Sequence, residues 1–575
     1  MRAFLVLFSL FSSVFGAEIK PSTLTVPGPF PTSLFSKYYN SPTVTSAQVQ
    51  PVISDPVTHE IYPFSLTDPD SVPKNNTVDP HPLPPTASPS RLVENAFAQI
   101  LSIAANPVFG DNRCARCIAG FEAAKFLALA APKQGPALAV RLCDHFKFSS
   151  TCSTTFGPLG TGGVITQVVA NADVGGLDGQ YLCQNFLNLC PLPAPPPLNL
   201  TAWFKKPKPN PLPPPKKSSG KRLKVLHLSD MHLDARYSTG AEANCTTGLC
   251  CRKGGFNSQS PNATLLPAPR FGAYHWQTLL YDLLKKTLGP GPVYATLGNH
   301  DSYNQAQDAP HAIGQGLAGQ FSWNYDHLAL LWKHEKWLPD SAVRLARTHY
   351  AGYMVKRADN LRVISLNTDM CGVADELCYR TVWSGYRANY FNYINMTDHD
   401  VSGMLRFLTD ELQDAEDHGE RVWIIGHVLS GWDGTNPLIP ATDLFYQIVD
   451  RFSPHVIANV FFGHTHEDQM SIFYRNNATV MNSDTAHALA WMGPSLTPGT
   501  NMNSGFRVYE VDSATFEVLD AHTWRSDVST FPGLDSQLAL GPTYAYEYST
   551  RDTYGKTIQD WGANDPLNAT WWHRV

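Results

Sequence analysis

The sequence predicts an α/β protein in which a small, all-helical, disulfide-bonded domain precedes a larger domain of alternating strands and helices. Two observations lead to this fold class. Six cysteines lie between residues 93 and 190 within apolar patterns of helical period, and from Leu223 onward short β-branched runs end in Gly, Asn, Asp or His. Buried strands with polar ends and helices between them are typical of α/β folds.

The N-terminus has the pattern of a secretory signal peptide over residues 1–17. A single Arg precedes an apolar run, and Gly16 and Ala17 offer a small-residue cleavage site. A buried N-terminal strand is the alternative. No later run reaches 18 apolar residues, so we expect a soluble protein that is secreted or delivered to a vacuolar or lysosomal lumen. A net charge of −6 argues against nucleic-acid binding, and we expect a monomer.

Glycosylation sequons are consistent with this compartment. They lie at Asn75, Asn199, Asn244, Asn262, Asn395, Asn477 and Asn568. The cysteines number 11, an odd count that leaves one thiol without a partner if all the others pair.

Composition divides the rest of the chain. Residues 18–92 are rich in Pro, Ser and Thr and predict a largely disordered leader. The six-cysteine domain spans 93–190. A Pro- and Lys-rich stretch at 191–222 predicts a semi-rigid linker whose lysines are solvated, with attraction to anionic lipid as the alternative. The α/β domain follows at 223–525, and residues 526–575 predict a helical C-terminal extension.

The six cysteines follow the spacing C-x2-C, C-x8-C and C-x6-C. Spacing alone permits fifteen pairings, and a zinc site is disfavoured because no partner group follows at zinc-finger spacing. The pattern resembles saposin B-type domains, and this resemblance implies the pairs Cys114–Cys190, Cys117–Cys183 and Cys143–Cys152. It also implies contact with lipid surfaces, although a plain helical bundle without a lipid role would have the same cysteines.

Candidate metal ligands follow the apolar strands of the second domain. Asp and His residues lie at the end of the first predicted strand, and Asn and His residues lie at the end of the second. Histidines lie at the ends of the third and fourth predicted strands. These residues are Asp230, His232, Asn299, His300, His427, His464 and His466. Because the ends of neighbouring strands share one edge of a sheet, these imidazole and carboxylate groups predict a site for zinc or a similar divalent metal.

The order of these motifs resembles the calcineurin-like metallophosphoesterases. Together with the saposin-like module, RFGAY and PVYATLGNHDS, the chain from about 93 to 525 resembles the acid sphingomyelinase family. The resemblance implies a β-sandwich flanked by helices and two zinc ions. Asp230, His232 and His466 would hold one, and Asn299, His427 and His464 the other. It further implies that a metal-bound hydroxide cleaves sphingomyelin into ceramide and phosphocholine, with His300 as general acid. Orienting a metal ligand is the alternative role for His300.

One family motif is absent. The metal-bridging Asp of a Gly-Asp pair should lie between the first two motifs, but the chain's Gly-Asp pair is Gly110–Asp111. Asp282 lies in mid-helix on a polar side and is a poor substitute. In the family, the cluster Cys245, Cys250 and Cys251 forms two disulfides. In this chain Cys245 and Cys250 keep their disulfide partners. Cys251 does not, because the cysteine that should follow the RFG motif is missing. Both absences predict a deletion between Tyr274 and His275.

Three functions remain open from the sequence. The first is a phosphodiesterase acting on sphingomyelin or a related phospholipid, with activity in doubt because of the missing motif. The second is a catalytically impaired lipid-binding protein. The third, a phosphomonoesterase or polyphosphatase on the same fold, stays open because fold alone does not fix the substrate, although the saposin-like module disfavours it.

Overall fold

The structure is a computed structural model of the 575-residue chain. It describes residues 19–28, 53–54, 61–62, 83–84, 91–158, 160–232, 269–289, 291–302, 306–370, 389–430, 439–498, 502–534, 536–537 and 539–575. The signal-peptide prediction, the three cysteines Cys245, Cys250 and Cys251, and the sequons at Asn75, Asn244 and Asn262 lie outside these residues. None of the described helices is long and apolar enough to cross a membrane.

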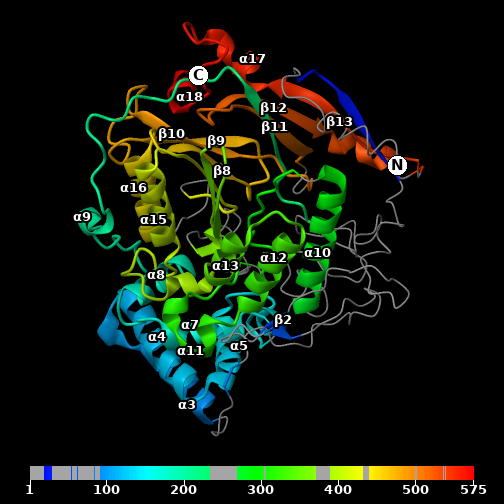
Figure 1. The fold of residues 1–575 in the computed structure, drawn as a ribbon. Helices are drawn as coiled ribbons and strands as arrows, with labels where there is room; N and C mark the ends of the chain where they lie inside the picture. Colours follow the sequence, from blue (N-terminus) through cyan, green and yellow to red (C-terminus); the bar gives the residue numbers. More distant parts are fainter. Residues whose placement is uncertain are drawn as a thin grey trace.

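The six-cysteine region is a helical domain that lies beneath the rest of the molecule in Figure 1. Its helices are α3 (Arg91–Ala105), α4 (Arg113–Ala130), α5 (Gly135–Phe146), α6 (Cys152–Phe156), α7 (Gly162–Asn171) and α8 (Leu177–Asn185). The disulfides join Cys114 to Cys190, Cys117 to Cys183 and Cys143 to Cys152, which are the pairs implied by the saposin resemblance. Disulfides between helices limit the unfolded chain and stabilise a domain with a small core.

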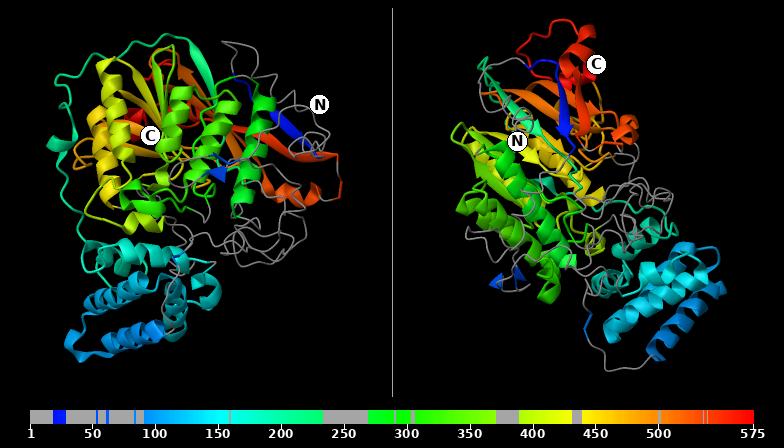
Figure 2. Two further views of the ribbon diagram at one scale, coloured as in Figure 1. Left: turned by 60° about the horizontal axis from the view of Figure 1, so that its bottom comes forward. Right: turned by 90° about the vertical axis from the view of Figure 1, so that its right-hand side faces the viewer.

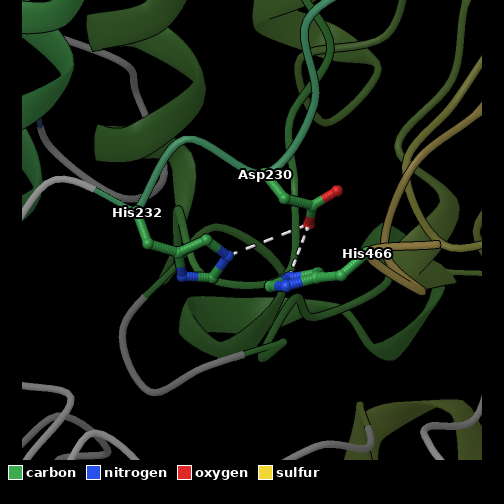
Figure 3. Close-up of side chains that lie close together, drawn as sticks. All are labelled: Asp230, His232 and His466. Carbon is green, nitrogen blue, oxygen red and sulfur yellow. Dashed lines mark ion pairs between the residues drawn. The ribbon is translucent and has the colours of Figure 1, made fainter. Parts of the chain in front are cut away.

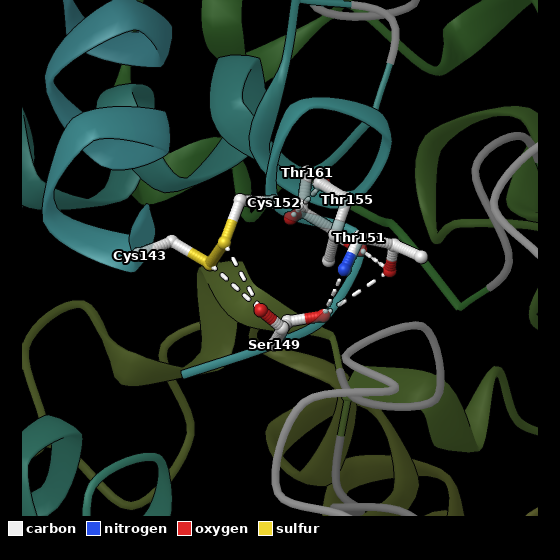
Figure 4. Close-up of a disulfide and its surroundings, with 6 residues drawn as sticks. All are labelled: Cys143, Ser149, Thr151, Cys152, Thr155 and Thr161. Carbon is white, nitrogen blue, oxygen red and sulfur yellow. Dashed lines mark hydrogen bonds between the residues drawn. A yellow bond between two sulfur atoms is a disulfide. The ribbon is translucent and has the colours of Figure 1, made fainter. Parts of the chain in front are cut away.

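The third disulfide closes a short loop between α5 and α6 (Figure 4). Hydroxyl groups lie along this loop: Ser149 Oγ is 3.1 Å from Thr151 Oγ1, which is 3.0 Å from Thr155 Oγ1. The Thr161 hydroxyl donates to the carbonyl of Thr155 at 2.8 Å and joins the loop to the start of α7. The disulfide and these hydrogen bonds therefore fix one end of the helical domain.

Two β-sheets form the centre of the larger domain (Figures 1 and 2). The first has the order β1-β13-β12-β11-β4, and the second has the order β5-β6-β7-β8-β10-β9. The first sheet consists of β1 (Thr23–Pro27), β4 (Arg222–His227), β11 (Ser504–Asp512), β12 (Val518–Ser526) and β13 (Leu540–Ser549). The second consists of β5 (Tyr353–Lys356), β6 (Leu361–Ser365), β7 (Arg421–Ile425), β8 (Ile457–Phe462), β9 (Gln469–Tyr474) and β10 (Ala486–Met492).

Alternation along the strands separates two cores. Val363 and Trp423 point toward the first sheet and share a buried cluster with Tyr509. Their neighbours Ile364 and Ile424 point the other way and pack among the helices. Successive side chains of a strand face opposite sides, so one sheet can serve both cores. The result is the expected β-sandwich flanked by helices.

Four long helices cover the outer face of the second sheet. They are α12 (Ser322–His334), α13 (Asp340–Thr348), α15 (Met404–Asp417) and α16 (Ile439–Phe452). The helical domain joins the same core through a stacked contact between Phe186 and Tyr390, whose ring centroids are 5.2 Å apart. Asp178 reinforces this junction by accepting the backbone N–H groups of Asn395 at 2.9 Å and Met396 at 2.7 Å.

Both ends of the chain correct the sequence prediction. Residues 23–27 of the predicted disordered leader form β1, which pairs with β13. The C-terminal extension is helical only later, in α17 (Thr550–Tyr554) and α18 (Ala569–Arg574), because residues 540–549 form β13. Tyrosines at every second position, Tyr544, Tyr546 and Tyr548, have the period of a strand. The leader's contribution to the sheet depends on a partner more than 500 positions away.

The linker is largely exposed, as expected of a solvated spacer, but its first part also contacts the larger domain. It includes α9 (Leu200–Trp203) and runs along α15 and α16. Trp203 donates its indole N–H to Thr409 at 3.0 Å, and the Arg406 guanidinium lies 4.1 Å from the Trp203 ring centroid. The linker lysines form ion pairs with these helices: Lys205 with Asp410, Lys206 with Asp417, and Lys208 with Asp450.

The point of the inferred deletion lies inside one helix. α10 (Pro269–Leu288) continues through Tyr274 and His275. The expected apolar face of leucines is only half-buried at Leu280, Leu283 and Leu284, while Gln277, Thr278 and Tyr281 are buried instead. The amphipathic helix is therefore present, but its most buried side is not the leucine side.

Residues 292–297, which the sequence predicts to be a strand, form no strand. Side chains hold this segment in place: the Tyr353 hydroxyl donates to the carbonyl of Ala295 at 2.7 Å, and the Thr296 hydroxyl donates to the carbonyl of Leu366 at 3.1 Å. A strand requires a ladder with a neighbour, and the described residues provide none here.

Candidate metal centre

Asp230 lies just after β4, in a loop that turns sharply. Its φ of 53° is in the left-handed region, which is uncommon for a residue with a side chain. The backbone of the preceding Ser229 bridges to Ser495, and the Ser495 hydroxyl donates to the Asp230 carbonyl at 3.3 Å. The strained turn is thus held from both sheets, as is common where a functional side chain must point in one direction.

The two oxygens of the Asp230 carboxylate have different surroundings. Oδ2 accepts the Ser229 hydroxyl at 2.5 Å and the backbone N–H of His464 at 2.9 Å. Oδ1 faces three imidazoles: it is 3.3 Å from Nε2 of His466, 3.6 Å from that of His427 and 3.8 Å from that of His232. Figure 3 shows His232 and His466 approaching this oxygen from separate loops.

These side chains form a compact group. Asp230, His232 and His466 each offer a ligand atom within 4.8 Å of the others. Burial by itself would raise the pKa of Asp230, but the neighbouring imidazoles of His427, His232 and His466 outweigh burial and hold that pKa well below its ordinary value. The carboxylate therefore stays ionised and available as a ligand.

The second set of expected ligands adjoins the first. Nε2 of His427 lies 2.9 Å from Oδ1 of Asn299, and the rings of His427 and His464 have centroids 5.2 Å apart. His427 follows β7, and His464 follows β8, its parallel neighbour in the sheet. The structure thus brings together all six residues that the sequence assigns to metal binding.

Glycines make this close approach possible. A Cβ atom on Gly463 would lie 2.0 Å from the Ser229 hydroxyl oxygen and 2.9 Å from Oδ2 of Asp230. A Cβ atom on Gly298 would lie 3.1 Å from the ring of His427. The Gly-His and Gly-Asn-His motifs therefore begin with glycine because side chains from other loops of the site pack directly against the backbone there.

His300 is exposed at the edge of this group. Its ring centroid is 4.6 Å from that of His232, while His232 is 5.1 Å from His466. An exposed imidazole beside the ligand set can reach a bound substrate more readily than the half-buried histidines can. This position suits both the acid role and the orienting role considered from the sequence.

Several supporting residues were not singled out by the sequence. The hydroxyl of Thr368, just after β6, accepts the backbone N–H of His427 at 3.0 Å. The hydroxyl of Thr497 accepts that of His232 at 3.0 Å. Threonine is too common on loops for either position to be recognised without the tertiary contact.

The donor set fits a divalent metal. Oδ1 of Asp230 lies among imidazole nitrogens, and the other Asp230 oxygen is used to hold the loop. Imidazole, carboxylate and amide oxygen are the ligands that zinc and related metals take in proteins. In the part of the chain that the structure describes, this is the one group of three acids, histidines or cysteines that could hold a metal ion.

A bridging carboxylate is not found within that part of the chain. Asp282, the remaining aspartate between the motifs, forms an ion pair with Lys286 one turn along α10. Asp301, which follows His300, accepts the backbone N–H of Gly298 at 2.9 Å and stabilises the turn that carries Asn299. Asp282 and Asp301 are thus engaged within α10 and within the Asn299 turn, and neither takes the place of the missing Gly-Asp motif.

The disulfide-bonded helical domain, the two-sheet sandwich and the histidine–carboxylate group match a metallophosphoesterase fold preceded by a saposin-type domain. The chain is similar in sequence to sphingomyelin phosphodiesterases. It is 30% identical to the sphingomyelin phosphodiesterase of Bos taurus over 384 residues, which cover 58% of this chain and 55% of the bovine protein. It is 29% identical to sphingomyelin phosphodiesterase 2 of Caenorhabditis elegans, over 58% of this chain and 59% of that protein.

A relative named for a different substrate is also similar. A cyclic GMP-AMP phosphodiesterase of Homo sapiens is 27% identical over 40% of this chain and 45% of that protein. No family model matches the chain. The chain spans a little over half the length of the sphingomyelin phosphodiesterases named above.

Proposed function

We propose that this chain is a zinc-dependent phosphoric diester hydrolase that acts on sphingomyelin or a related phospholipid. The observation that carries the proposal is the position of Asp230 Oδ1 among the Nε2 atoms of three histidines. The homologous sphingomyelin phosphodiesterases support the substrate class. When bound, the metal ions would supply the Lewis acidity that polarises the phosphodiester.

The residues of the chain have separate roles in this proposal. Asp230, His232 and His466 would hold one metal, and Asn299, His427 and His464 the other. The oxygen of a water molecule would form the new bond to phosphorus, and His300 would donate its proton to the departing ceramide oxygen as the old phosphorus–oxygen bond breaks, which leaves ceramide and phosphocholine as products. The exposure of His300 beside His232 supports this assignment.

A lipid surface is the partner that the helical domain fits best. Phe126 and Leu129 lie three positions apart near the end of α4 and are 64% and 63% exposed, and Val108, in the 3-10 helix that precedes α4, is 87% exposed. Exposed apolar side chains of this kind are stabilised by insertion into the interfacial region of a lipid layer. We further propose that the protein works as a secreted or lumenal monomer, with glycans on the exposed Asn199, Asn395 and Asn477. The side chains of Asn199 and Asn568 cap α9 and α18, and Asn568 is the less suited of the two because it is only partly exposed.

A catalytically impaired lipid-binding protein is the second candidate. Two observations favour it: residues 292–297 have no strand partner among the described residues, and the leucine side of α10 is only half-buried. Both are expected if a strand and helix were deleted near Tyr274, together with the bridging Asp. Two cations held close together without a bridging anion repel one another, so the second metal would bind weakly.

Release of phosphocholine from sphingomyelin in mixed micelles tests the proposal. We expect the 575-residue chain to be slow, by at least the roughly 10–100-fold that changes around a metal centre cost. Insertion of the corresponding segment of a complete relative between Tyr274 and His275 should raise the rate and remove the free thiol of Cys251. His466→Ala in that restored chain should abolish the gain.

The outcomes separate the two functions. Rapid hydrolysis by the original chain would contradict the deletion hypothesis and require another acid to bridge the metals. No hydrolysis by the restored chain, despite two bound metals, would contradict the assignment to phosphodiesterases and favour the lipid-binding protein.

A further inference from the structure

Two buried aspartates lie close to the candidate metal centre and are not part of it. Asp308 is 0% exposed and follows the loop that carries Asn299. Asp369 is 3% exposed and lies in the 3-10 helix Thr368–Met370, immediately after β6. We call Asp308 and Asp369 the buried acid pair.

The pair is unequally satisfied. Asp308 accepts the hydroxyl of Tyr325 on one oxygen and the amide N–H of Asn367 at 3.1 Å on the other. Neither carboxylate oxygen of Asp369 has a hydrogen-bond partner among the described residues. No Lys or Arg of those residues forms an ion pair with either acid. A buried charge without a partner is costly, so buried carboxylates normally either bind a cation or hold a proton.

The two acids also influence each other. Burial, followed by the charges of Asp308 and Asp301, raises the pKa of Asp369 well above its ordinary value. Burial raises the pKa of Asp308 to about 6, against the lowering effect of its bonds to Tyr325 and Asn367. Negative charge therefore accumulates in this part of the interior when both acids ionise.

Amide side chains lock the backbone around the pair. Asn389 donates to the carbonyl of Asp308 at 2.8 Å, and Asn392 donates to the carbonyl of Asp369 at 2.8 Å. Asn367 accepts the backbone N–H of Asp369 at 3.1 Å. These bonds fix the backbone at both acids, and both residues are buried where that backbone places them. A partner for the carboxylates must therefore lie in the interior.

The chemistry of the surroundings indicates which kind of partner the buried acid pair binds. The side chains around the pair offer carboxylate, amide and phenolic oxygens, and none of the contacts described above involves a histidine or cysteine. Carboxylate and amide oxygens are the ligands of hard divalent cations such as Ca²⁺, whereas the neighbouring histidine group suits zinc. A carboxylate oxygen that accepts one hydrogen bond keeps a further lone pair for a cation.

We propose that Asp308 and Asp369 bind a divalent cation of the oxygen-preferring class, represented by Ca²⁺, at a site separate from the histidine centre. The cation joins the Asn299 loop to the end of β6. It thereby braces Thr368, whose hydroxyl holds the backbone of His427. The site does not depend on the proposed hydrolase activity, and it would remain if the chain were only a lipid-binding protein.

Unfolding of the full chain in urea tests the site. The protein is stripped of metal with a chelator and then titrated with Ca²⁺ alone. At a Ca²⁺ concentration about 100 times the dissociation constant, the folding equilibrium constant should rise about 100-fold. Asp369→Asn should abolish this rise, because it removes a charge but breaks no hydrogen bond among the described residues. Asp282→Asn, at an ion-paired position on α10, should keep the rise.

The histidine centre is controlled separately. His466→Ala should lose zinc and keep the Ca²⁺-dependent gain, which would show that two sites exist. An equal gain in Asp369→Asn would place the Ca²⁺ elsewhere and overturn the proposal. Absence of any gain in the parent chain would overturn it too, by showing that a proton alone neutralises the pair. If Asp369→Asn does not fold, Ca²⁺ binding to the parent chain and to Asp308→Asn is compared by equilibrium dialysis. Weaker binding to Asp308→Asn would support the site, and equal binding to both proteins would overturn the proposal.

Discussion

Nε2 of His466 lies 3.3 Å from Oδ1 of Asp230, although the two residues follow strands of different sheets. Asp230 follows β4 of the first sheet, and His466 follows β8 of the second. The sandwich therefore closes at the metal centre, and the contact between its sheets is part of the ligand geometry. Loss of packing between the sheets would separate these ligands even if every ligand were intact.

Metal content should depend on that contact. We expect His466→Ala to reduce zinc affinity by at least roughly 10–100-fold, because it removes one of the three groups of the compact ligand set. Metal analysis after dialysis against a weak chelator measures this. His418→Ala is the control, since His418 is an exposed residue at the end of α15. Equal metal content in the two variants would show that the site is assigned wrongly.

Glu335 should make stability depend on pH. It is buried, its Oε1 atom has no partner among the described residues, and burial together with the charge of Asp282 raises its pKa to about 7. The folded state thus binds this proton more tightly than the unfolded state does. The contribution of Glu335 is complete below the ordinary pKa of 4.5 and is lost as the pH rises to about 7.

Glu335→Gln should remove this dependence. We expect the variant to match the parent near pH 4 and to gain up to about 2–3 kcal/mol in free energy of unfolding by pH 8, because each tenfold difference in proton affinity between the folded and unfolded states contributes about 1.4 kcal/mol. Urea unfolding across that pH range provides the comparison. Parallel pH profiles for the two proteins would mean that Glu335 ionises normally in the folded state.

The docked linker should contribute measurably to stability. Trp203→Ala removes the hydrogen bond to Thr409 and the cation–π contact with Arg406. We expect a loss of about 1–3 kcal/mol, because the side chain is half-buried rather than fully buried. Thermal or urea unfolding measures this loss of stability, and the loss should be smaller for Trp203→Phe than for Trp203→Ala. A loss below about 0.5 kcal/mol would indicate that the linker is not held in solution.

Binding to lipid should depend on the exposed apolar residues of α4. The double variant Phe126→Asp and Leu129→Asp should weaken binding to phospholipid vesicles at least about tenfold, since two apolar side chains would no longer enter the interface. Met481→Asp is the matched control, because Met481 is 65% exposed on the larger domain. Similar losses from both changes would show that lipid contact is not confined to the helical domain.

The candidate ligand set could be predicted because four of its members directly follow a serine or glycine at the end of an apolar run, and His232 and His466 lie two positions further on. Asp230, Asn299, His427 and His464 stand in motifs whose order is visible without any structure. The disulfide pairs Cys114–Cys190, Cys117–Cys183 and Cys143–Cys152 followed from the resemblance to saposin domains, and the structure has the same pairs. Local pattern and spacing, together with that resemblance, were sufficient for these features.

Other features depended on partners far away in the chain. Residues 23–27 form a strand only because β13 lies beside them, while residues 292–297 have strand-like composition but no ladder among the described residues. The sequence did not show that the solvated lysines of the linker also have carboxylate partners on α15 and α16.

The sequence by itself therefore determined the order of the helical and α/β regions and the candidate ligand residues, because these are carried by residue type at short spacing, while the disulfide pairs needed the resemblance to saposin domains as well. The tertiary structure alone decided which strands pair, how the linker docks and that Asn367 contacts both Asp308 and Asp369. A backbone hydrogen bond, an ion pair or a buried charge has an energy only in relation to its partner. When that partner lies hundreds of residues away, composition at either position gives no sign of it.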